Sequence, residues 1–529
     1  MNKRRMLAIF LTLCMAIALL AGCGGGGGKD DSAATPPAGE AASPPAASEV
    51  KYADLIDILL PDAVTTPDPH HTGGAGSGHR AVFKCIFDRL VERAPSGDFV
   101  GRLASSWSTD DLKTWTFNLR NDVKFHNGQQ FTAQDVINTV VSAQNSPGAS
   151  GYNMWREVDT ITAKDDYTIE IVLGDVNADF LFFISDPAAS IINKAARDAD
   201  PVTGAYEGTG AFYVSDFVSG EYMTLTRNDD YWGEAPKTRQ LNFRWVPEMT
   251  ARAIMMENME SDFAWVLNAE DLPPFEKDTV NFTIYRFIEN AAFTLAFNMN
   301  DPITGDLNFR MAVAHAMYLP DVGMAAEGDK AVIQQDGTFW GYSTEFRNTD
   351  IPILAFDQDL AKEYLAKSNY NGEEVEIMAA LPPNIKASEM MAEQLSAVGI
   401  NTTLFITDIA NLNTVAIYGN TVTQMVTTVS PFGSYASSAK NFLSPEGGGN
   451  RSNYSNPEVN RLFDLGPTIV DRGEREKVYK EIQELVHADL PKINHFHLTF
   501  PMVATSALQG FVIDPDQNHD FRYIYKIVE

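Results

Sequence analysis

The chain has 529 residues, of which 44% are hydrophobic and 11% aromatic, enough apolar sequence for roughly two or three domains with cores of their own. Its 70 acidic residues outnumber its 40 basic residues, and the formal net charge is −30. A surface of that sign repels phosphate backbones, so the composition argues against a nucleic-acid partner and is typical of a highly soluble protein.

The N-terminus has the pattern of a secretion signal. Lys3, Arg4 and Arg5 precede an apolar stretch over residues 6–21 that is too short for a good membrane span. The stretch ends in Leu-Ala-Gly-Cys, which resembles the lipobox of bacterial lipoproteins. That resemblance implies a lipoprotein signal peptide over residues 1–22, cleavage before Cys23 and diacylglycerol on its sulfur. A plain signal peptide or an uncleaved anchor is the alternative.

Residues 23–49 are rich in Gly, Ala and Pro and contain almost no large apolar side chains. Such a segment cannot bury enough surface to fold, so we predict a disordered tether. No second apolar run of about 18 residues follows it, which places the rest of the chain outside the membrane. Beyond the lipobox only Cys85 remains, so an internal disulfide is excluded, and its apolar neighbours at helical spacing predict a buried core cysteine.

The first half of the remaining chain mixes strands and helices. Residues 115–119 and 169–173 alternate apolar with polar side chains, which predicts half-buried strands. Between them, Thr132 and Asp135 have the spacing of a capping box, and Pro147 closes the helix that follows.

The second half contains a predicted βαβ unit. Residues 375–381 and 402–406 alternate as strands do, and a helix from about residue 385 stops at Gly399. Parallel strands of this kind need a right-handed helical crossover. A long helix is expected over residues 474–489. Mixed elements in both halves predict two α/β lobes.

Several motifs, in order over nearly all of residues 50–529, resemble the ABC-transporter solute-binding proteins of family 5, the peptide/nickel/oligopeptide-binding lipoproteins. Most of the matched residues, Asp88 and Trp232 among them, are interpreted as serving folding rather than binding. The matching stretches are residues 87–91 (FDRLV), 101–107 (GRLASSW), 115–128 (WTFNLRNDVKFHNG), 131–136 (FTAQDV), 228–233 (NDDYWG) and 295–300 (LAFNMN).

The resemblance implies an α/β, periplasmic-binding-protein-like fold of type II, cluster C, in which two lobes close on a ligand like a flytrap. It also implies an extra inserted domain near the N-terminus. Carried onto this chain, lobe I comprises residues 50–94, 206–300 and 498–529, the inserted domain residues 95–205, and lobe II residues 301–497.

Ligands in such folds sit in the crevice near strand ends and crossover segments. One candidate contact is His71, next to a glycine-rich loop that either faces the cleft or receives an anion on free N–H groups. A second is the aromatic pair Tyr152 and Trp155, which is expected either to stack on a ligand or to pack in the core.

The stretch from residue 429 to 443 differs from the family pattern in an informative way. Peptide-binding members have a Trp and an Asp where this chain has Phe432 and Tyr435, and that Asp neutralises the peptide's α-amino group. No acidic residue occurs between Asp408 and Glu446. Because a buried ammonium without a counter-ion costs several kcal/mol, peptides with a free N-terminus are disfavoured, and Phe432 and Tyr435 become candidate contacts for a neutral, modified or sugar-like ligand.

The two crossover segments supply the remaining candidates. His495 and His497 alternate along a strand, so they are expected to share a side and to edge the cleft or form half a metal site, although no complete metal site is predicted. Phe293 and Asn298 lie at the earlier crossover.

The function that the resemblance implies is an extracytoplasmic substrate-binding lipoprotein of an ABC importer, which captures a peptide or peptide-like solute and delivers it to the permease. We expect a monomer without a cofactor, anchored by lipid at the outer face of the cytoplasmic membrane. A non-peptide ligand (oligosaccharide, modified peptide or nickel complex) and a role as a ligand-presenting receptor remain alternatives. A secreted hydrolase is a further alternative, but the chain contains neither a GxSxG elbow nor an HExxH helix.

Overall fold

The computed structural model describes residues 51–66, 68–70, 77–414, 424–514 and 518–528. Residues 50–529 form one compact unit. The predicted signal peptide, the tether, the lipobox Cys23 and the candidate contact His71 lie outside the described residues. No helix among the described residues is long and apolar enough to cross a membrane.

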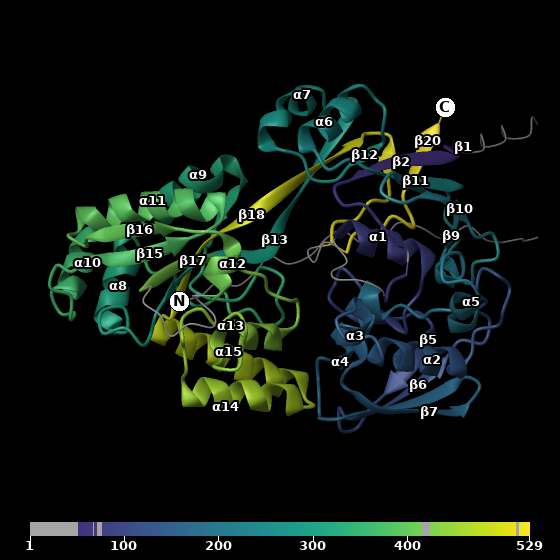
Figure 1. Ribbon diagram of the computed structural model, residues 1–529, viewed down its shortest axis with the longest axis horizontal. Helices are drawn as coiled ribbons and strands as arrows, with labels where there is room; N and C mark the ends of the chain where they lie inside the picture. Colours follow the sequence, from purple (N-terminus) through teal and green to yellow (C-terminus); the bar gives the residue numbers. More distant parts are fainter. Residues whose placement is uncertain (1–50, 67, 71–76, 415–423, 515–517, 529) are drawn as a thin grey trace, which may run out of the picture. The chain divides into compact units, whose positions relative to one another are not determined.

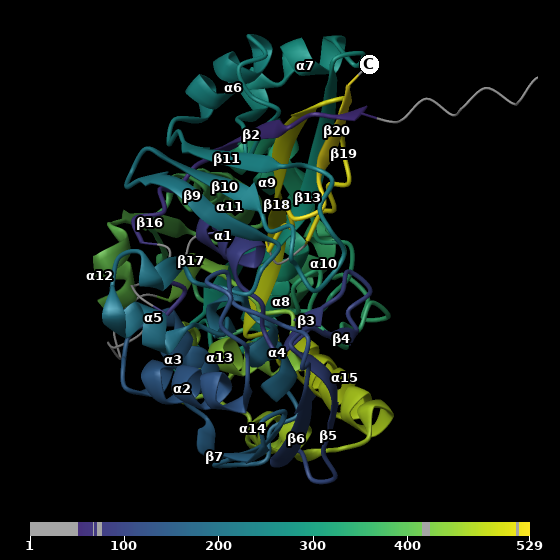
Figure 2. The same cartoon turned by 90° about the vertical axis from the view of Figure 1, so that its right-hand side faces the viewer.

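One eleven-stranded mixed sheet organises the compact unit. At its centre β13 (Phe282–Phe297) and β18 (Lys492–Thr505) pair antiparallel along nearly their whole length (Figures 1 and 2). On one side follow β12 (Phe263–Ala264), β2 (Leu55–Leu60), β11 (Gln240–Trp245), β10 (Tyr222–Arg227) and β9 (Phe212–Val218). On the other side follow β17 (Met425–Ser430), β15 (Val375–Ala379) and β16 (Thr402–Ile406), while β14 (Ala331–Ile333) pairs with β18.

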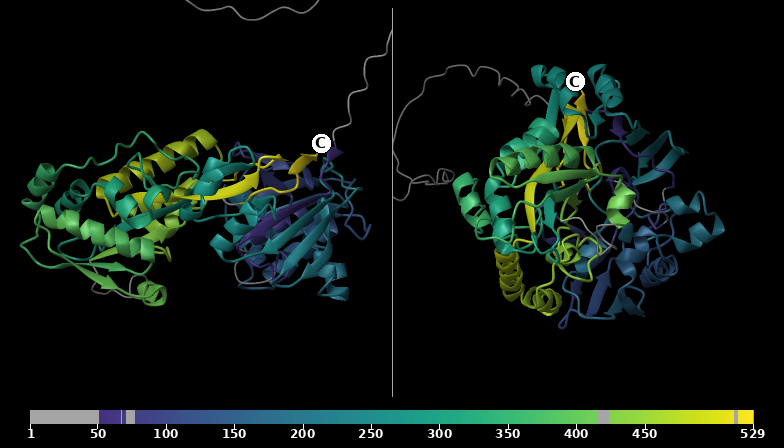
Figure 3. Two further views of the ribbon diagram at one scale, coloured as in Figure 1. Left: turned by 90° about the horizontal axis from the view of Figure 1, so that it is seen from above. Right: turned by 60° about the vertical axis from the view of Figure 1, so that its left-hand side comes forward.

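The two long strands carry the chain between its two halves. In the left view of Figure 3, β18, in yellow, runs from the half drawn mainly in green to the half that contains the C-terminus. Each half has its own core: Ile58, Phe243 and Trp265 belong to one, and Phe297 and Leu395 to the other. The two-lobed α/β architecture is therefore confirmed. The domain boundaries given above stay a prediction.

Lobe I carries helix α1 (Ser77–Ile86) against its sheet, and Cys85 on that helix is fully buried, as predicted. The segment that leads into β9 approaches the end of α1 closely. A Cβ at Gly210 would lie 2.5 Å from the backbone O of Cys85 and 2.5 Å from the backbone C of Ile86. Only a residue without a side chain fits there.

A separate four-stranded sheet follows in sequence, in the order β5 (Ala104–Ser108), β6 (Thr114–Leu119), β8 (Thr168–Leu173) and β7 (Val158–Asp165). Helices α2 (Ala133–Gln144) and α3 (Ser150–Trp155) accompany it (Figure 1). The capping box between Thr132 and Asp135 is present, and β6 and β8 are the two predicted strands.

The βαβ unit of the other half is also confirmed. Strands β15 and β16 are parallel, and α11 (Pro382–Ala397) connects them. Helices α8 (Leu307–Ala316), α9 (Leu319–Glu327) and α10 (Gln358–Leu365) belong to the same half, together with α14 (Pro457–Leu465). The long helix α15 (Arg472–Asp489) starts two residues before the predicted position, because Asp471 caps it by accepting a hydrogen bond from the Glu474 N–H.

We predict that Gly210→Ala lowers the free energy of unfolding by about 2 kcal/mol or more, because the new methyl group overlaps backbone atoms that cannot move aside. Thermal and denaturant unfolding measure the change. Gly174→Ala is the matched control, since a Cβ at that exposed glycine meets nothing closer than 3.9 Å. Equal stability of the two variants would contradict the close-approach argument.

Candidate functional site

A cavity of about 620 Å³ opens among segments from both halves of the central sheet and from residues 95–205, the predicted inserted domain, called the inserted region below. That volume lies within the range typical of small-molecule sites. Its walls come from α1 and β3 (Val91–Arg93), from α4 (Phe180–Ser185) and the turn after it, from the β13 crossover and from the loop after β17. The lining residues used below are Arg80, Lys84, Arg89, Glu92, Arg93, Phe182, Phe183, Asp186, Glu289, Asn290, Phe432, Tyr435, Asp514 and Asn518.

One wall is aromatic and joins the inserted region to lobe II. The ring of Tyr435 lies 5.2 Å from that of Phe183 and 5.9 Å from that of Phe182, measured between centroids. The Arg93 guanidinium lies 5.1 Å above Phe182. Burial raises the pKa of Tyr435, so its phenol stays protonated and keeps an O–H donor.

Phe432 forms part of the same wall but is held by its own core. Its ring packs at 5.1 Å against both Phe339 and Phe442, and only 6% of the residue is exposed. Its backbone oxygen accepts a hydrogen bond of 3.1 Å from the Asn290 side chain. Phe432 therefore presents a fixed edge to the cavity.

The floor of the cavity is a break in the central strand pair. Between Ile288 and Ala292 the register of β13 against β18 shifts, and residues 289–291 line the cavity there. Asn290 secures the break, because its Oδ1 accepts from Ser343 N at 2.9 Å while its Nδ2 donates to Phe432 O. His497 secures it from the other side, with Nδ1 2.9 Å from the Ala291 oxygen and Nε2 2.8 Å from Gln334 Oε1.

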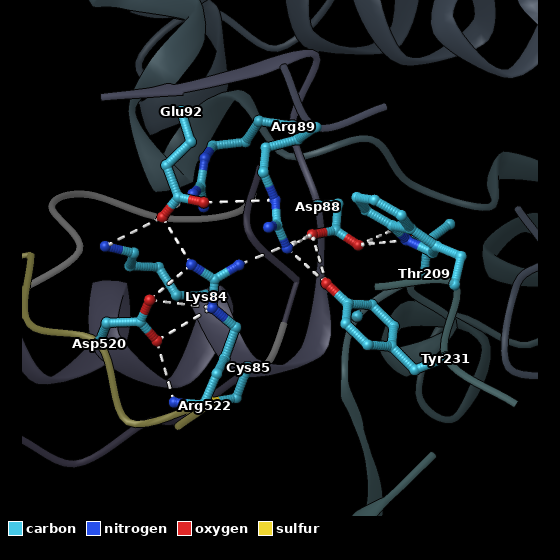
Figure 4. Close-up of polar contacts among 12 residues, drawn as sticks. Lys84, Cys85, Asp88, Arg89, Glu92, Thr209, Tyr231, Asp520 and Arg522 are labelled. Carbon is cyan, nitrogen blue, oxygen red and sulfur yellow. Dashed lines mark hydrogen bonds and ion pairs between the residues drawn. The ribbon is translucent and has the colours of Figure 1, made fainter. Parts of the chain in front are cut away.

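The wall from lobe I is highly charged. Four cationic side chains form ion pairs with the Glu92 carboxylate (Figure 4). The distances from their nitrogens to its oxygens are 3.4 Å for Lys84, 3.1 Å for Arg89, 3.3 Å for Arg102 and 2.6 Å for Arg522. These neighbours hold the pKa of Glu92 well below its usual range against the opposing effect of burial.

Asp88 lies behind this wall and is 1% exposed. It accepts hydrogen bonds from Arg102 at 2.9 Å, Trp232 Nε1 at 3.0 Å and Thr209 at 3.3 Å. These contacts join the FDRLV and NDDYWG motifs to each other, so both motif residues serve the scaffold, as the sequence suggested.

The inserted region and lobe II also touch directly beside the cavity. Asp179 is 2% exposed and accepts a short hydrogen bond from the Ser437 hydroxyl, while Ala178 N donates to Pro467 O at 2.9 Å. Burial raises the pKa of Asp179 to about 6, with Glu345 adding to the shift. Burial therefore disfavours the ionised form of Asp179, while the hydrogen bond from Ser437 partly stabilises it.

Of the candidate contacts named from sequence, Phe432 and Tyr435 line the cavity. The other candidates within the described residues do not belong to its lining. Trp155 is fully buried in the core of the four-stranded sheet, and Tyr152 lies half-buried on the same short helix, where only Met154 reaches the cavity. A ring that other core side chains already cover has no face left for a ligand, so Trp155 is withdrawn as a candidate.

The candidate residues at the crossover segments also make contacts outside the cavity. Phe293 stacks on Phe496 at 4.5 Å inside the lobe II core, and Asn298 accepts from the Asn453 side chain at 3.1 Å. His495 is fully buried at a second register shift of β18, and burial lowers its pKa to about 3.

That His495 and His497 share a side of the strand stays a prediction. His497 makes structural contacts, and burial lowers its pKa to about 4. Neither histidine lines the cavity, and within the described ranges no group of three or more His, Cys, Asp or Glu side chains could hold a metal ion.

The cavity contains carboxylates that could pair with the N-terminal amine of a peptide, contrary to the expectation from residues 429–443. The stretch from residue 409 to 445 lacks an acid, but Asp186, Glu289 and Asp514 reach the cavity from other segments. Asp186 pairs with Arg80 there. Tertiary structure therefore supplies carboxylates that the local sequence does not contain.

Several cavity residues were missed from sequence. Arg89 stands inside a matched motif, and most of the matched residues were interpreted as serving the fold. Phe182 and Phe183 belong to a continuous apolar run that looks like a core helix. Lys84 and Arg80 are four residues apart on α1, a spacing that places them on one helix face. That spacing was the one usable signal.

This architecture is shared with known proteins of similar sequence. The family model "Bacterial extracellular solute-binding proteins, family 5 Middle" matches residues 98–452. The chain belongs to this family. It is an extracytoplasmic solute-binding protein of the ABC-importer class.

Individual relatives agree over most of the chain. Heme-binding protein A of Haemophilus influenzae is 25% identical over 83% of this chain and 86% of its own length. The dipeptide-binding protein of Escherichia coli is 24% identical over 85% of this chain and 90% of its own length. Among solved structures, HbpA2 from Haemophilus parasuis superposes with a TM-score of 0.81 at 21% identity, covering 89% of this chain and 99% of that one.

We predict that Asp179→Asn raises the melting temperature at about pH 7.5 more than at about pH 4.5. The folded protein binds a proton at Asp179 more tightly than the unfolded chain does, so stability is lost as pH rises from about 4 to about 6, up to roughly 3 kcal/mol.

Thermal unfolding at the two pH values measures the difference. Buried histidines titrate equally in both proteins and cancel in the comparison. Asp175→Asn, at an exposed carboxylate of the same segment, is the control and should show no such pH dependence. A pH-independent effect of Asp179→Asn would contradict the role given to this carboxylate.

Proposed function

We propose that this protein is a lipid-anchored receptor that captures a peptide or peptide-like solute in the 620 Å³ cavity and delivers it to an ABC permease. The observation that carries the proposal is the composition of the cavity wall. It combines α1 and β3 of lobe I, the crossover at residues 289–291 and Tyr435 of lobe II, so a bound solute contacts both lobes at once.

The chemistry of the wall favours a peptide-like solute. Stacking rings at Phe182, Phe183 and Tyr435 suit planar peptide groups or apolar side chains. Cationic and anionic side chains both reach the cavity, which suits a zwitterion better than a neutral sugar. Two relatives of nearly equal identity are named for heme and for dipeptides, so similarity alone does not choose the ligand.

The position of the ligand contacts on both lobes explains why a bound ligand would favour closure of the lobes. A ligand bound to lobe I alone lacks the ring of Tyr435, and one bound to lobe II alone lacks the charged wall. A ligand stabilises the closed form by the contacts that only this form offers. The permease then recognises the closed form, and ATP hydrolysis takes place on separate subunits.

Mass spectrometry of the ligand that co-purifies with residues 50–529 tests the solute class. We expect peptides or peptide-like molecules. Thermal-shift screening of peptides, oligosaccharides and nickel salts provides an independent check. Recovery of a sugar or a metal complex, with no stabilisation by peptides, would show that the solute class is wrong.

We predict that Tyr435→Ala weakens binding of the co-purifying ligand by about tenfold or more, because a buried aromatic side chain at the centre of a contact surface carries much of the affinity. Calorimetric titration of the ligand-stripped protein measures the change. Tyr213→Ala, an exposed tyrosine that does not line the cavity, is the control and should bind normally. Unchanged affinity of Tyr435→Ala would place the ligand elsewhere.

We predict that Cys23→Ala moves the protein from the membrane fraction to the soluble fraction or leaves it with its signal uncleaved, because the proposed lipid attaches to that sulfur. Cell fractionation and intact mass measure both outcomes. Cys85→Ala is the control and keeps the lipid, since Cys85 is buried in the folded body. A Cys23→Ala protein that still carries lipid would refute the anchor.

A further inference from the structure

The charged wall of the cavity has more cationic than anionic groups in mutual contact. Several of these groups form one network of ion pairs (Figure 4). Its cations are Lys84, Arg89, Arg102 and Arg522, and its carboxylates are Asp88, Glu92 and Asp520. Four cations thus share three carboxylates. A buried group of like charges with too few counter-ions is unfavourable, and a further anion nearby would stabilise it.

Within this cluster Arg89 is the cation whose donors have the fewest partners. Among the described residues its guanidinium makes one ion pair, from Nη2 to Glu92 Oε1 at 3.1 Å. Its Nε and Nη1 are buried and have no hydrogen-bond partner among the described residues, although the residue as a whole is 1% exposed. Leaving buried charged donors unsatisfied is unfavourable, because they have lost their water partners without gaining others. Arg89 also belongs to the cavity lining.

Glu92 cannot satisfy Arg89 further, because its Oε1 also faces Arg522 at 2.6 Å and Lys84 at 3.4 Å. Burial lowers the pKa of Arg89 despite the Glu92 carboxylate, as expected where Arg522 and Arg102 are also near. Arg522, in contrast, has Asp520 as well as Glu92.

An unsatisfied acceptor lies in the same corner. Lys84 donates to the backbone oxygen of Asn518 at 2.7 Å, which brings Asn518 beside the cluster. The side-chain Oδ1 of Asn518 is buried without a hydrogen-bond partner in the described part of the chain, and Asn518 also lines the cavity. The corner therefore offers donors for an anionic oxygen next to an acceptor for an N–H group.

We propose that Arg89 receives the C-terminal carboxylate of a peptide-like ligand and that Asn518 accepts the neighbouring amide N–H. An N–H group of Arg89 that has no partner can donate to an oxygen of the carboxylate, and the guanidinium charge strengthens that hydrogen bond. The aromatic wall at Tyr435 then contacts the ligand farther from its carboxyl end. This inference rests on the proposed capture of a peptide-like solute in this cavity and adds the direction in which the solute is held.

The test uses an equimolar tripeptide library in three forms: unmodified, amidated at the C-terminus, and acetylated at the N-terminus. Binding to residues 50–529 is measured by affinity selection with mass spectrometry and confirmed by calorimetry. We expect unmodified and acetylated peptides to bind, and amidated peptides to bind about tenfold or more weakly. In Arg89→Gln, free-acid and amidated peptides should bind alike.

Arg102→Gln is the matched control, because Arg102 belongs to the same cluster, contacts Asp88, Tyr231 and Glu92, and does not line the cavity. It should lower the melting temperature more than Arg89→Gln does and keep the preference for the free acid. If Arg89→Gln fails to fold while Arg102→Gln folds, Arg89 is a scaffold residue and the inference is overturned.

The outcomes separate the inference from the function on which it rests. Equal binding of free-acid and amidated peptides by the wild-type chain leaves peptide capture standing and refutes the carboxylate corner. A preference for the free acid that survives in Arg89→Gln refutes the role of Arg89. Absence of binding by all three library forms contradicts peptide capture itself, and the inference fails with it.

Discussion

The antiparallel pairing of β13 with β18 is the constraint on which the rest of the structure depends. These two strands pair with each other at the centre of the eleven-stranded sheet, and the other described strands of that sheet follow on one side of the pair or the other, with β14 paired to β18. A sheet interrupted here would separate the two cores, because the chain crosses between the lobes along these strands. The register break at residues 289–291 occurs in this pair and places the strand backbone at the floor of the cavity. The same two strands thus connect the lobes and contribute to the ligand site.

The residues around the break explain how a site at a crossover can be well ordered. Asn290 satisfies a backbone N–H and a backbone carbonyl from two different loops, and His497 approaches carbonyl groups of the broken segment. β-Bulges leave backbone groups unpaired, and these side chains pair them. A buried polar network of this kind specifies one geometry, since each donor has few alternative partners. The edge that Phe432 presents to the cavity is held by the same network.

The charged wall of lobe I, unlike the residues around the break, contains buried polar groups without partners among the described residues. Most of its groups are paired, as the contacts of Asp88 show, but Arg89 retains two buried N–H groups without partners. Proteins rarely leave buried donors unsatisfied, and those that occur concentrate at functional sites. Solvation by the cavity contents is the physical means by which such a group becomes stable. Capture of a solute and stabilisation of the wall are then one event, which couples ligand chemistry to the closed form.

The contact of Asp179 with Ser437 adds a second coupling, between proton uptake and the contact of the inserted region with lobe II. Burial of Asp179 beside this contact costs free energy when the carboxylate is ionised, and the hydrogen bond from Ser437 offsets only part of that cost. Tyr435 lies beside it and contacts both Phe182 and Phe183. The same strip of surface thus contributes the aromatic wall and the proton-sensitive contact.

Local patterns determined much of this protein before any coordinates. The capping box at Thr132 and Asp135, the βαβ unit ending in β16, the buried Cys85 and the family all follow from neighbours in sequence, because short-range spacing sets periodicity, caps and motif order. Phe432 and Tyr435 were found for the same reason, since they stand where family members place ligand contacts. Only the tertiary structure decided that Trp155 and Phe293 are core, that His495 and His497 are buried outside the cavity lining, and that Asp186 and Arg89 reach the cavity. Burial and charge pairing arise between segments hundreds of residues apart, such as Glu92 with Arg522, and no local window of sequence contains that information.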